Sequence, residues 1–337
     1  MNKKIFTIII PVYNAEKTIE RTLASLISNK DFIYEVIIVN DNCTDITLSK
    51  IDSFLQFFPI RVINSIGKKS PGAARLTGIH SAKSEWLTFV DADDCLTPSS
   101  LYYVYREIQK YPDLKLLHTQ TIYYESGSFD PFAISRMDNS CGGNFYNLKY
   151  LIENDLYPHM ELKMAEDEYF NEKINRYITY CDPLNLPNIK AFEYPVYEVH
   201  HDIDEGLSFA LSNWVDYLCK YHLEAEKELI IFFKDKVKDI SVMKNDYIIN
   251  FIFCFYLIQG LIQDEEIDFS LKDNLIYFKE YVKYYNLLFQ SDYMDFLNYY
   301  TFHKDVVKDL KKSAEESTGI NISEDLDFIS FLWEVKE

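Results

Sequence analysis

The first 125 residues alternate between short, continuous apolar runs and longer segments in which apolar residues recur every three or four positions. The β-branched run IFTIIIPV (5–12) is typical of a strand buried on both faces of a parallel sheet. The segment 15–29 that follows has the spacing of an amphipathic helix. These two patterns repeat, which predicts strands at 5–12, 34–41, 60–64, 85–93 and 114–125 and helices at 15–29, 45–58, 70–84 and 98–111. Such alternation predicts an α/β fold built on a doubly wound, mainly parallel sheet.

Beyond residue 125 the pattern becomes irregular and then helical. Two helices and a strand are predicted first, at 147–154, 165–178 and 191–201 respectively. From about residue 209 the pattern is helical to the end, with breaks near 263–271 and 313–323. The chain is therefore expected to form two domains, an α/β domain over 1–208 and an α-helical C-terminal region over 209–337.

The charge is acidic overall and unevenly distributed along the chain. The formal net charge is −19. Residues 1–130 hold 14 Lys/Arg and 15 Asp/Glu, whereas the remainder holds 20 and 38. Binding of free nucleic acid depends on a basic surface, so no nucleic-acid partner is expected. The change in composition also favours two parts with different surfaces.

Cysteine usage and hydropathy bear on the cellular compartment. The six cysteines form no CxxC pair and no zinc spacing with the histidines, which predicts free thiols in a reducing compartment. The basic and apolar N-terminus MNKKIFTIII is too short for a signal peptide. The apolar run 247–262 has 16 residues and includes Asn250 and Gln259, which is too little for a spanning helix. We therefore expect no transmembrane segment and a cytoplasmic location, with the inner face of the membrane as the alternative.

Acidic side chains follow two of the predicted strands at the point where each strand ends. Asp41 ends the second strand, and Asp91 and Asp93 end the fourth. Ligands of doubly wound sheets bind outside the carboxyl ends of the strands. Residues two apart on a strand point to the same side, so Asp91 and Asp93 suit Mg²⁺ or Mn²⁺, with substrate phosphates as further ligands. The alternative is a solvated acidic turn, or a cap for the helix 98–111.

Four stretches carry a resemblance to a known family. TIIIPVYNAEKTIERTLASL, EVIIVNDNCTD, PGAARLTGIHSAKSEWLTFVDADD and AEDEYF occur in the order and spacing of the family 2 glycosyltransferases, which have the A-type glycosyltransferase fold. The sequence resembles that family over roughly residues 5–210. The resemblance implies an inverting glycosyltransferase that depends on Mn²⁺ or Mg²⁺. Its expected donor is a UDP-sugar, and its expected acceptor is a saccharide, a glycoprotein or another hydroxyl compound in glycan, capsule or other polysaccharide assembly.

The resemblance also implies roles for individual residues. It places the nucleotide against residues of the strand ends, the loops after them and the third helix, namely Pro11, Tyr13, Glu16, Asp41, Arg75, Asp91 and Ala92. Asp45 closes the motif that contains Asp41. Asp93 corresponds to the metal ligand, and Asp167 lies where the family carries its catalytic base. His200 and His201 lie where the family often has an Arg or His that reaches the diphosphate or the metal. Neighbouring strand residues point opposite ways, so one of these two histidines is expected to face the site as a metal ligand.

These roles agree with the chemistry of sugar transfer. A cation at Asp93 would balance the negative charge that develops on the diphosphate leaving group. A carboxylate at Asp167, within reach of the acceptor hydroxyl, can take its proton. Without the resemblance, Glu166 and Asp167 are explained as acids that complement the dipole of a helix N-terminus. The histidines are equally explained as a structural pair.

The sequence departs from the family pattern in its second and third stretches. Asn40 replaces the first Asp of the usual pair, and Asn42 and Cys43 replace Gly and Ser. Leu76 and Ser84 stand where the family usually has Asn and often has Gly. These changes concern the nucleotide contacts rather than the fold. The lack of a Gln-x-x-Arg-Trp motif and of a multi-helix membrane portion argues against a processive synthase.

Two other functions remain open. A nucleotidyltransferase also uses a doubly wound sheet with metal-binding acids, but PVYNAEKT lacks the Gly-rich basic loop expected after its first strand. A noncatalytic relative would keep the fold as a binding or scaffolding module, which the retained Asp91, Asp93 and Asp167 argue against. For a transferase, residues 1–208 are the nucleotide-sugar-binding catalytic domain. The region 209–337 is then expected to shape the acceptor site or to form a homo-oligomer.

Overall fold

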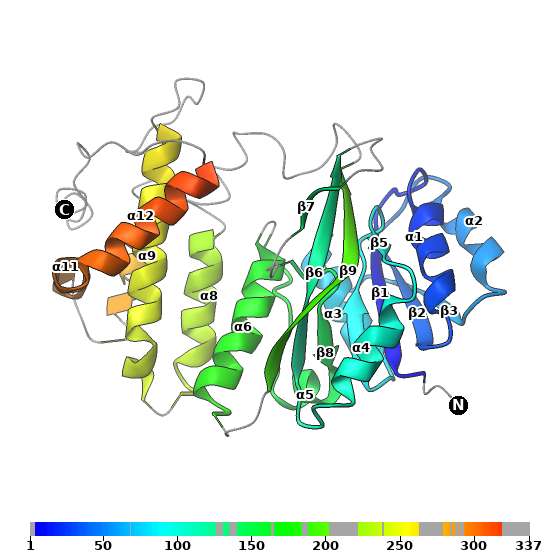
Figure 1. Cartoon of the computed structure of the whole chain (residues 1–337), viewed down its shortest axis with the longest axis horizontal. Helices are drawn as coiled ribbons and strands as arrows, with labels where there is room; N and C mark the ends of the chain where they lie inside the picture. Colours follow the sequence, from blue (N-terminus) through cyan, green and yellow to red (C-terminus); the bar gives the residue numbers. More distant parts are fainter. Residues whose placement is uncertain are drawn as a thin grey trace. The chain divides into compact units, whose positions relative to one another are not determined.

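The chain divides into two compact units, Met1–Gly206 and Leu207–Glu337. The structure is a computed structural model of the whole chain (Figure 1). The residues that it describes are 4–67, 69–125, 131–134, 140–162, 165–183, 188–201, 222–237, 239–262, 279–283, 285–286, 289 and 293–318.

A mixed sheet forms the centre of the first unit, with the strand order β3-β2-β1-β4-β8-β6-β9-β5 and β7 paired to β6. Its strands are β1 (Phe6–Val12), β2 (Ile33–Asn40), β3 (Ile60–Asn64), β4 (Trp86–Phe89), β5 (Cys95–Leu96), β6 (Leu116–Glu125), β7 (Pro131–Ile134), β8 (Phe145–Asn147) and β9 (Ile189–His201). The helices of the unit are α1 (Ile19–Ser25), α2 (Thr47–Ile51), α3 (Pro71–Ser81), α4 (Ser100–Ile108), α5 (Leu148–Glu153) and α6 (Glu166–Tyr180). The expected α/β fold class is confirmed by this arrangement.

The doubly wound, parallel part of the sheet is β3-β2-β1-β4, in which every neighbouring pair is parallel. The short strand β8 then enters antiparallel between β4 and β6, so β6 runs in the direction of β4 without pairing with it. β9 pairs parallel with β6, and β5 pairs antiparallel with β9. Six of the nine strands formed by the described residues thus share one direction, although the sheet is mixed from β4 outward.

The apolar strands β1 and β2 are buried on both faces, as their sequence predicted. Ile8 and Ile10 belong to a core cluster that also holds Ile19 and Leu23 of α1. On the opposite face α3 lies close to β1, because a Cβ added at Gly78 would lie 2.3 Å from Ile9 Cγ2. A side chain there would collide with the sheet, so this glycine serves close helix–sheet packing.

The fourth predicted strand, 85–93, is shorter in the structure than the sequence indicated. β4 ends at Phe89, and a turn follows in which the Asp94 N–H donates to the Asp91 carbonyl at 3.1 Å. The chain then forms β5, which the sequence did not predict. A two-residue strand shows no periodicity, and the polar acids that precede it favour a turn over an extended run.

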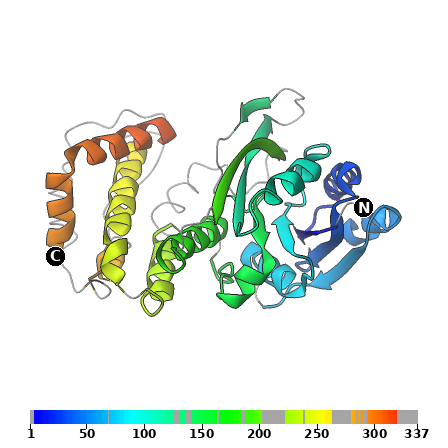
Figure 2. The ribbon, with the colours of Figure 1, turned by 60° about the horizontal axis from the view of Figure 1, so that its bottom comes forward.

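The second unit is helical, as expected, and contains α8 (Leu223–Phe233), α9 (Lys244–Ile262), α11 (Tyr293–Phe302) and α12 (Lys304–Thr318). Figure 2 shows α12 crossing α9, and the two helices pack together. The predicted break at 313–323 is wrong over 313–318, because α12 continues to Thr318. Val307 and Ala314 are both buried seven residues apart, so one face keeps packing through this stretch. The other predicted break, 263–271, lies outside the described residues.

None of the described helices combines the length and the apolar character needed to cross a membrane. The long helix α9 is instead part of an aromatic core in the second unit, in which the Phe251 ring lies 5.4 Å from that of Tyr281 and 4.7 Å from that of Phe296.

Candidate functional site

The residues expected at the strand ends meet at the carboxyl edge of the parallel strands. The Asp41 N–H, just after β2, donates to the carbonyl of Val12 in β1 at 2.8 Å. Pro11 lies half-buried in β1 and is in register with Val39 of β2. Tyr13 follows β1 and is 50% exposed, with Lys69 Nζ 3.1 Å from the centre of its ring. The ends of β1 and β2 therefore present an aromatic ring and a carboxylate at one edge.

The loops after β1 and β2 are joined by hydrogen bonds, some of them from Glu16, which the resemblance placed at the nucleotide. The Glu16 N–H donates to Asp45 Oδ2 at 3.1 Å, and Glu16 Oε2 accepts from the Ile46 N–H at 3.3 Å. Asn14, in the left-handed region at φ 48°, accepts from the Thr44 N–H through Oδ1 at 2.8 Å. Glu16 and Asp45 thus hold the two loops against each other.

Asp41 has a carboxylate oxygen for which the described residues supply no donor. Its side chain is buried, with 7% exposed. Burial raises the pKa of Asp41, and the nearby Lys69 opposes that rise. Oδ1 is buried and accepts no hydrogen bond from the described residues. A buried acceptor without a donor is costly, so a ligand N–H at this point would stabilise the site.

Arg75 links the end of β4 to the start of α6. Its guanidinium is buried in α3, with Nη2 2.9 Å from Asp91 Oδ1 and Nη1 2.5 Å from Glu166 Oε1. Burial opposes the charge of Arg75, but Asp91 and Glu166 contribute to raising its pKa, so it stays protonated. The two carboxylates are 75 positions apart in the sequence, and one arginine fork brings them together.

The turn Asp91–Asp94 directs its acids to opposite sides. Asp94 points inward, where Oδ2 accepts from the Tyr197 hydroxyl at 2.8 Å and Oδ1 accepts from the His200 N–H at 3.1 Å. Burial, together with the charges of Asp91 and Asp93, raises the pKa of Asp94 well above its usual range. Asp93 is exposed, and the Asp91 side chain is 40% exposed. The two acids expected to contact ligand therefore lie on the accessible side of the turn.

The backbone of this turn is fixed by α1 and β9. The Asp91 N–H donates to the Tyr197 oxygen at 3.0 Å. The carbonyl of Ala92 accepts from Thr22 Oγ1 at 2.9 Å, and that of Asp93 accepts from Arg21 Nη2 at 2.5 Å. The turn is thus held by hydrogen bonds from two elements, which limits the movement of its two accessible carboxylates.

Asp167 lies in the first turn of α6, immediately after Glu166. Burial and the charge of Glu166 raise the pKa of Asp167 to about 7, and Arg75 opposes the rise. Its Oδ1 accepts from the Glu168 N–H at 2.8 Å. A carboxylate with a pKa near neutrality is suited to exchange a proton with a substrate. The acids in the first turn of α6 also complement the helix dipole. A role in stabilising the helix and a role in proton transfer therefore fit the same residues.

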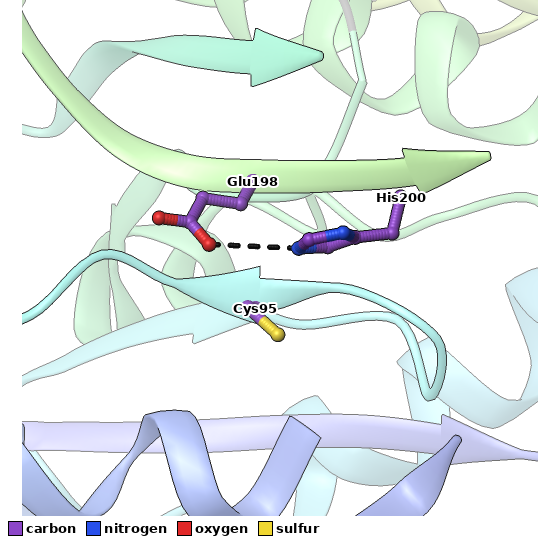
Figure 3. Close-up of side chains that lie close together, drawn as sticks. All are labelled: Cys95, Glu198 and His200. Atoms are coloured by element: carbon purple, nitrogen blue, oxygen red, sulfur yellow. Dashed lines mark ion pairs between the residues drawn. The ribbon is translucent and has the colours of Figure 1, made fainter. Parts of the chain in front are cut away.

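The two histidines end β9. The His200 ring stacks on Tyr124 with a centroid separation of 5.0 Å, and its Nε2 lies 3.5 Å from Glu198 Oε2. Figure 3 shows the imidazole facing Glu198 and the side of β5 that carries Cys95. The backbone of His201 belongs to β9, but its side chain lies outside the described ones.

Three residues of this site were missed by the sequence analysis or given only a helix-dipole role: Asp94, Glu166 and Tyr197. The third acid of the DADD stretch was a signal for Asp94, because three carboxylates so close together rarely share one environment. Tyr197 carried no such signal, since an aromatic residue in an apolar strand is ordinarily explained by packing.

The part of the chain that carries the candidate site is similar to known proteins. Residues 7–167 match the family model described as Glycosyl transferase family 2. TarS of Staphylococcus aureus, a poly(ribitol-phosphate) beta-N-acetylglucosaminyltransferase, is 29% identical over 183 residues, which are 50% of this chain and 32% of that protein. The minor teichoic acid biosynthesis protein GgaA of Bacillus subtilis is 34% identical over 108 residues, 30% of this chain and 24% of its own length. The matched part of the chain thus spans about a third of the length of TarS and about a quarter of the length of GgaA.

Solved structures extend the likeness to the whole fold. The crystal structure of S. aureus TarS 1–349 in complex with UDP-GlcNAc matches 97% of this chain and 98% of its own, with a TM-score of 0.63 and 19% identity. At that identity the match concerns the fold, and it confirms the expected A-type glycosyltransferase fold followed by a helical region.

Proposed function

We propose that this chain, whose residues 7–167 form a domain of glycosyl transferase family 2, transfers a sugar from a nucleoside diphosphate donor to a hydroxyl group with inversion. One observation carries the proposal. Arg75 joins Asp91, at the strand end where a donor diphosphate would lie, to the start of α6, where Asp167 lies. Groups suited to the leaving group and to the attacking hydroxyl are therefore held in one hydrogen-bonded network.

UDP is the donor nucleotide that the site supports best. Oδ1 of Asp41, which accepts no hydrogen bond within the described part of the chain, can accept the imide N–H of uracil, which cytosine does not have. The exposed ring of Tyr13 lies at the same edge and can stack on the base. The TarS fragment with the same fold was crystallised with UDP-GlcNAc, which supports a UDP-sugar for this chain as well.

The accessible carboxylates fit a hard divalent cation, Mn²⁺ or Mg²⁺. Asp93 is exposed and Asp91 is partly exposed in a turn whose backbone is held by hydrogen bonds from α1. Oxygen ligands of this type, completed by phosphate oxygens, are the usual set for these ions. When bound, the cation would supply positive charge to the diphosphate as it leaves.

The chain's own residues would perform the proton transfer. As the acceptor oxygen forms its bond to the anomeric carbon, the bond from that carbon to the donor phosphate breaks. Asp167 takes the hydroxyl proton, and Glu166 and Arg75 hold the start of α6 against the end of β4. Attack from the side opposite the leaving group inverts the anomeric centre.

The acceptor class follows from the relatives named above. They are named for poly(ribitol-phosphate) and teichoic acid, so we infer a hydroxyl of a polyol phosphate polymer, a saccharide or a related surface glycan. The helical unit Leu207–Glu337 is proposed to shape the acceptor site or to form an oligomer. The direct test is release of UDP from a panel of UDP-sugars, with mass spectrometry of the product on such acceptors. If no UDP-sugar is turned over with any of them, the proposal is wrong.

The pH dependence of the reaction should report Asp167. A general base must be deprotonated, so kcat/KM is expected to rise with pH and to level off above the pKa of about 7. Glu166→Gln removes the neighbouring charge that raises this pKa and is expected to move the rising limb to lower pH. Glu168→Gln removes a weaker contribution and should move it less. A limb that stays in place in Glu166→Gln, or moves to higher pH, would contradict the assignment.

A further inference from the structure

We propose that Cys95, Glu198 and His200 form a second metal site, separate from the one at Asp93, that binds a transition metal of the Zn²⁺ class. The three residues come from two strands that pair with each other. β5 is antiparallel to β9, and Cys95 is directly opposite Glu198. His200 follows Glu198 by two positions and therefore lies on the same face of β9. Figure 3 shows the side chains of Glu198 and His200 next to each other on β9, with the Cys95 side chain close by on β5.

The distances are near those of a metal site. One ligand atom from each residue lies within 4.8 Å of the others. Tetrahedral zinc with bonds of about 2.0–2.3 Å places its ligand atoms about 3.3–3.8 Å apart. The separation of His200 Nε2 and Glu198 Oε2, 3.5 Å, already falls in this range. The Cys95 sulfur lies within 4.8 Å of both other ligand atoms, and rotation about its χ1 would bring it closer to them.

The environment favours ligation over the alternative of a simple ion pair. His200 Nε2 is buried and makes no hydrogen bond with the described residues, and Glu198 Oε2 lies 3.5 Å from it. The ring is oriented by its stacking on Tyr124. Cys95 is 5% exposed, whereas the side chains of Glu198 and His200 are 20% exposed, which leaves a side for entry and for a water ligand.

The donor set separates this site from the one proposed at Asp93. Thiolate, imidazole and carboxylate together suit Zn²⁺ or Co²⁺, whereas Mg²⁺ and Mn²⁺ prefer oxygen ligands. Burial raises the pKa of Cys95 to about 11, so the thiol is protonated in the free protein. Binding therefore releases the Cys95 proton to solvent as the sulfur–metal bond forms.

A cation here would act on the acidic turn. Cys95 follows Asp94, whose Oδ1 accepts the His200 N–H at 3.1 Å. Coordination of one ion by both Cys95 and His200 would crosslink β5 to β9 beside the turn Asp91–Asp94. The site would thereby assign His200 to the support of the turn, whereas the sequence predicted that one of His200 and His201 binds the donor's metal.

The test is a Co²⁺ titration of the chelator-treated full chain, followed by thiolate-to-cobalt charge-transfer absorption. We expect one equivalent to produce the band and Zn²⁺ to displace it. The band should be lost in Cys95→Ser and kept in Cys181→Ser, which changes a half-buried cysteine elsewhere in the first unit. It should also be kept in Asp93→Asn. Thermal melts check that the variants are folded.

Glu198→Gln provides a second variant that retains the thiol. It should still show the band at saturation, with Co²⁺ affinity reduced by about tenfold or more. The proposal is overturned by the absence of a band in the wild type, by its persistence in Cys95→Ser, or by its loss in Asp93→Asn. Unchanged affinity in Glu198→Gln would also overturn it.

Discussion

Replacing Asp167 by Asn is expected to lower kcat for sugar transfer by about 10²–10⁴-fold. The amide keeps the size and position of the side chain but cannot accept the acceptor proton. Binding of UDP should be unchanged, because Asp167 lies at the start of α6 and the groups proposed to bind nucleotide lie at the strand ends. Steady-state rates of UDP release and calorimetric UDP titrations of the same preparation measure the two effects.

Glu168→Gln is the matched control for that substitution. Glu168 is the next acid of the same helix start, so both variants lose one charge from the N-terminal turn of α6. Its kcat at high pH is expected to stay within a few-fold of the wild type. If Asp167→Asn retained the wild-type rate, or if both variants lost it equally, the role of Asp167 as the base would be refuted.

Replacing Arg75 by Met is expected to lower the free energy of unfolding by about 3–5 kcal/mol. The substitution leaves Asp91 and the buried Glu166 facing each other without the guanidinium that now lies between them. Repulsion between the two carboxylates and the desolvation of Glu166 then both lower the stability of the folded state. Urea denaturation of the full chain measures the loss.

The comparison for Arg75 is an exposed ion pair of the same unit. Lys50 Nζ lies 2.7 Å from Glu20 Oε2, with the Glu20 side chain 54% exposed. Lys50→Met is expected to change stability by less than about 1 kcal/mol. Adding Glu166→Gln to Arg75→Met should recover part of the loss, because one buried charge is removed. Equal effects of Arg75→Met and Lys50→Met would show that the bridge does not hold the site together.

The parallel part of the sheet was predictable because the pattern of apolar residues within each short segment indicates its strand or helix. β1 is a continuous apolar or β-branched run, β2 and β3 are rich in Val and Ile, and each strand is followed by a segment of helical period. β5, β7 and β8 were missed because two to four residues are too few to show a period. Their pairing depends on partners remote in sequence, which turned the expected parallel continuation into a mixed sheet.

The candidate site was predictable where its residues lie at strand ends, but not where it depends on contacts between residues remote in sequence. The acids at the ends of β2 and β4 follow from where strands stop, so Asp41, Asp91 and Asp93 could be named beforehand. The contact between Arg75 and Glu166 joins residues 91 positions apart and left no local signal. The group Cys95, Glu198 and His200 has no zinc spacing along the chain, because strand pairing alone brings it together.

The central claim, that the acidic strand ends bind a nucleoside diphosphate with a divalent cation, is tested most directly by calorimetric titration with UDP. The titration is run with and without Mn²⁺ on the wild type, on Asp93→Asn and on the exposed control Asp113→Asn, with GDP and CMP for comparison. We predict Mn²⁺-dependent binding of UDP in preference to GDP and CMP, lost in Asp93→Asn and kept in Asp113→Asn. Failure of every nucleotide to bind under any condition, or unchanged UDP binding in Asp93→Asn, would contradict the claim.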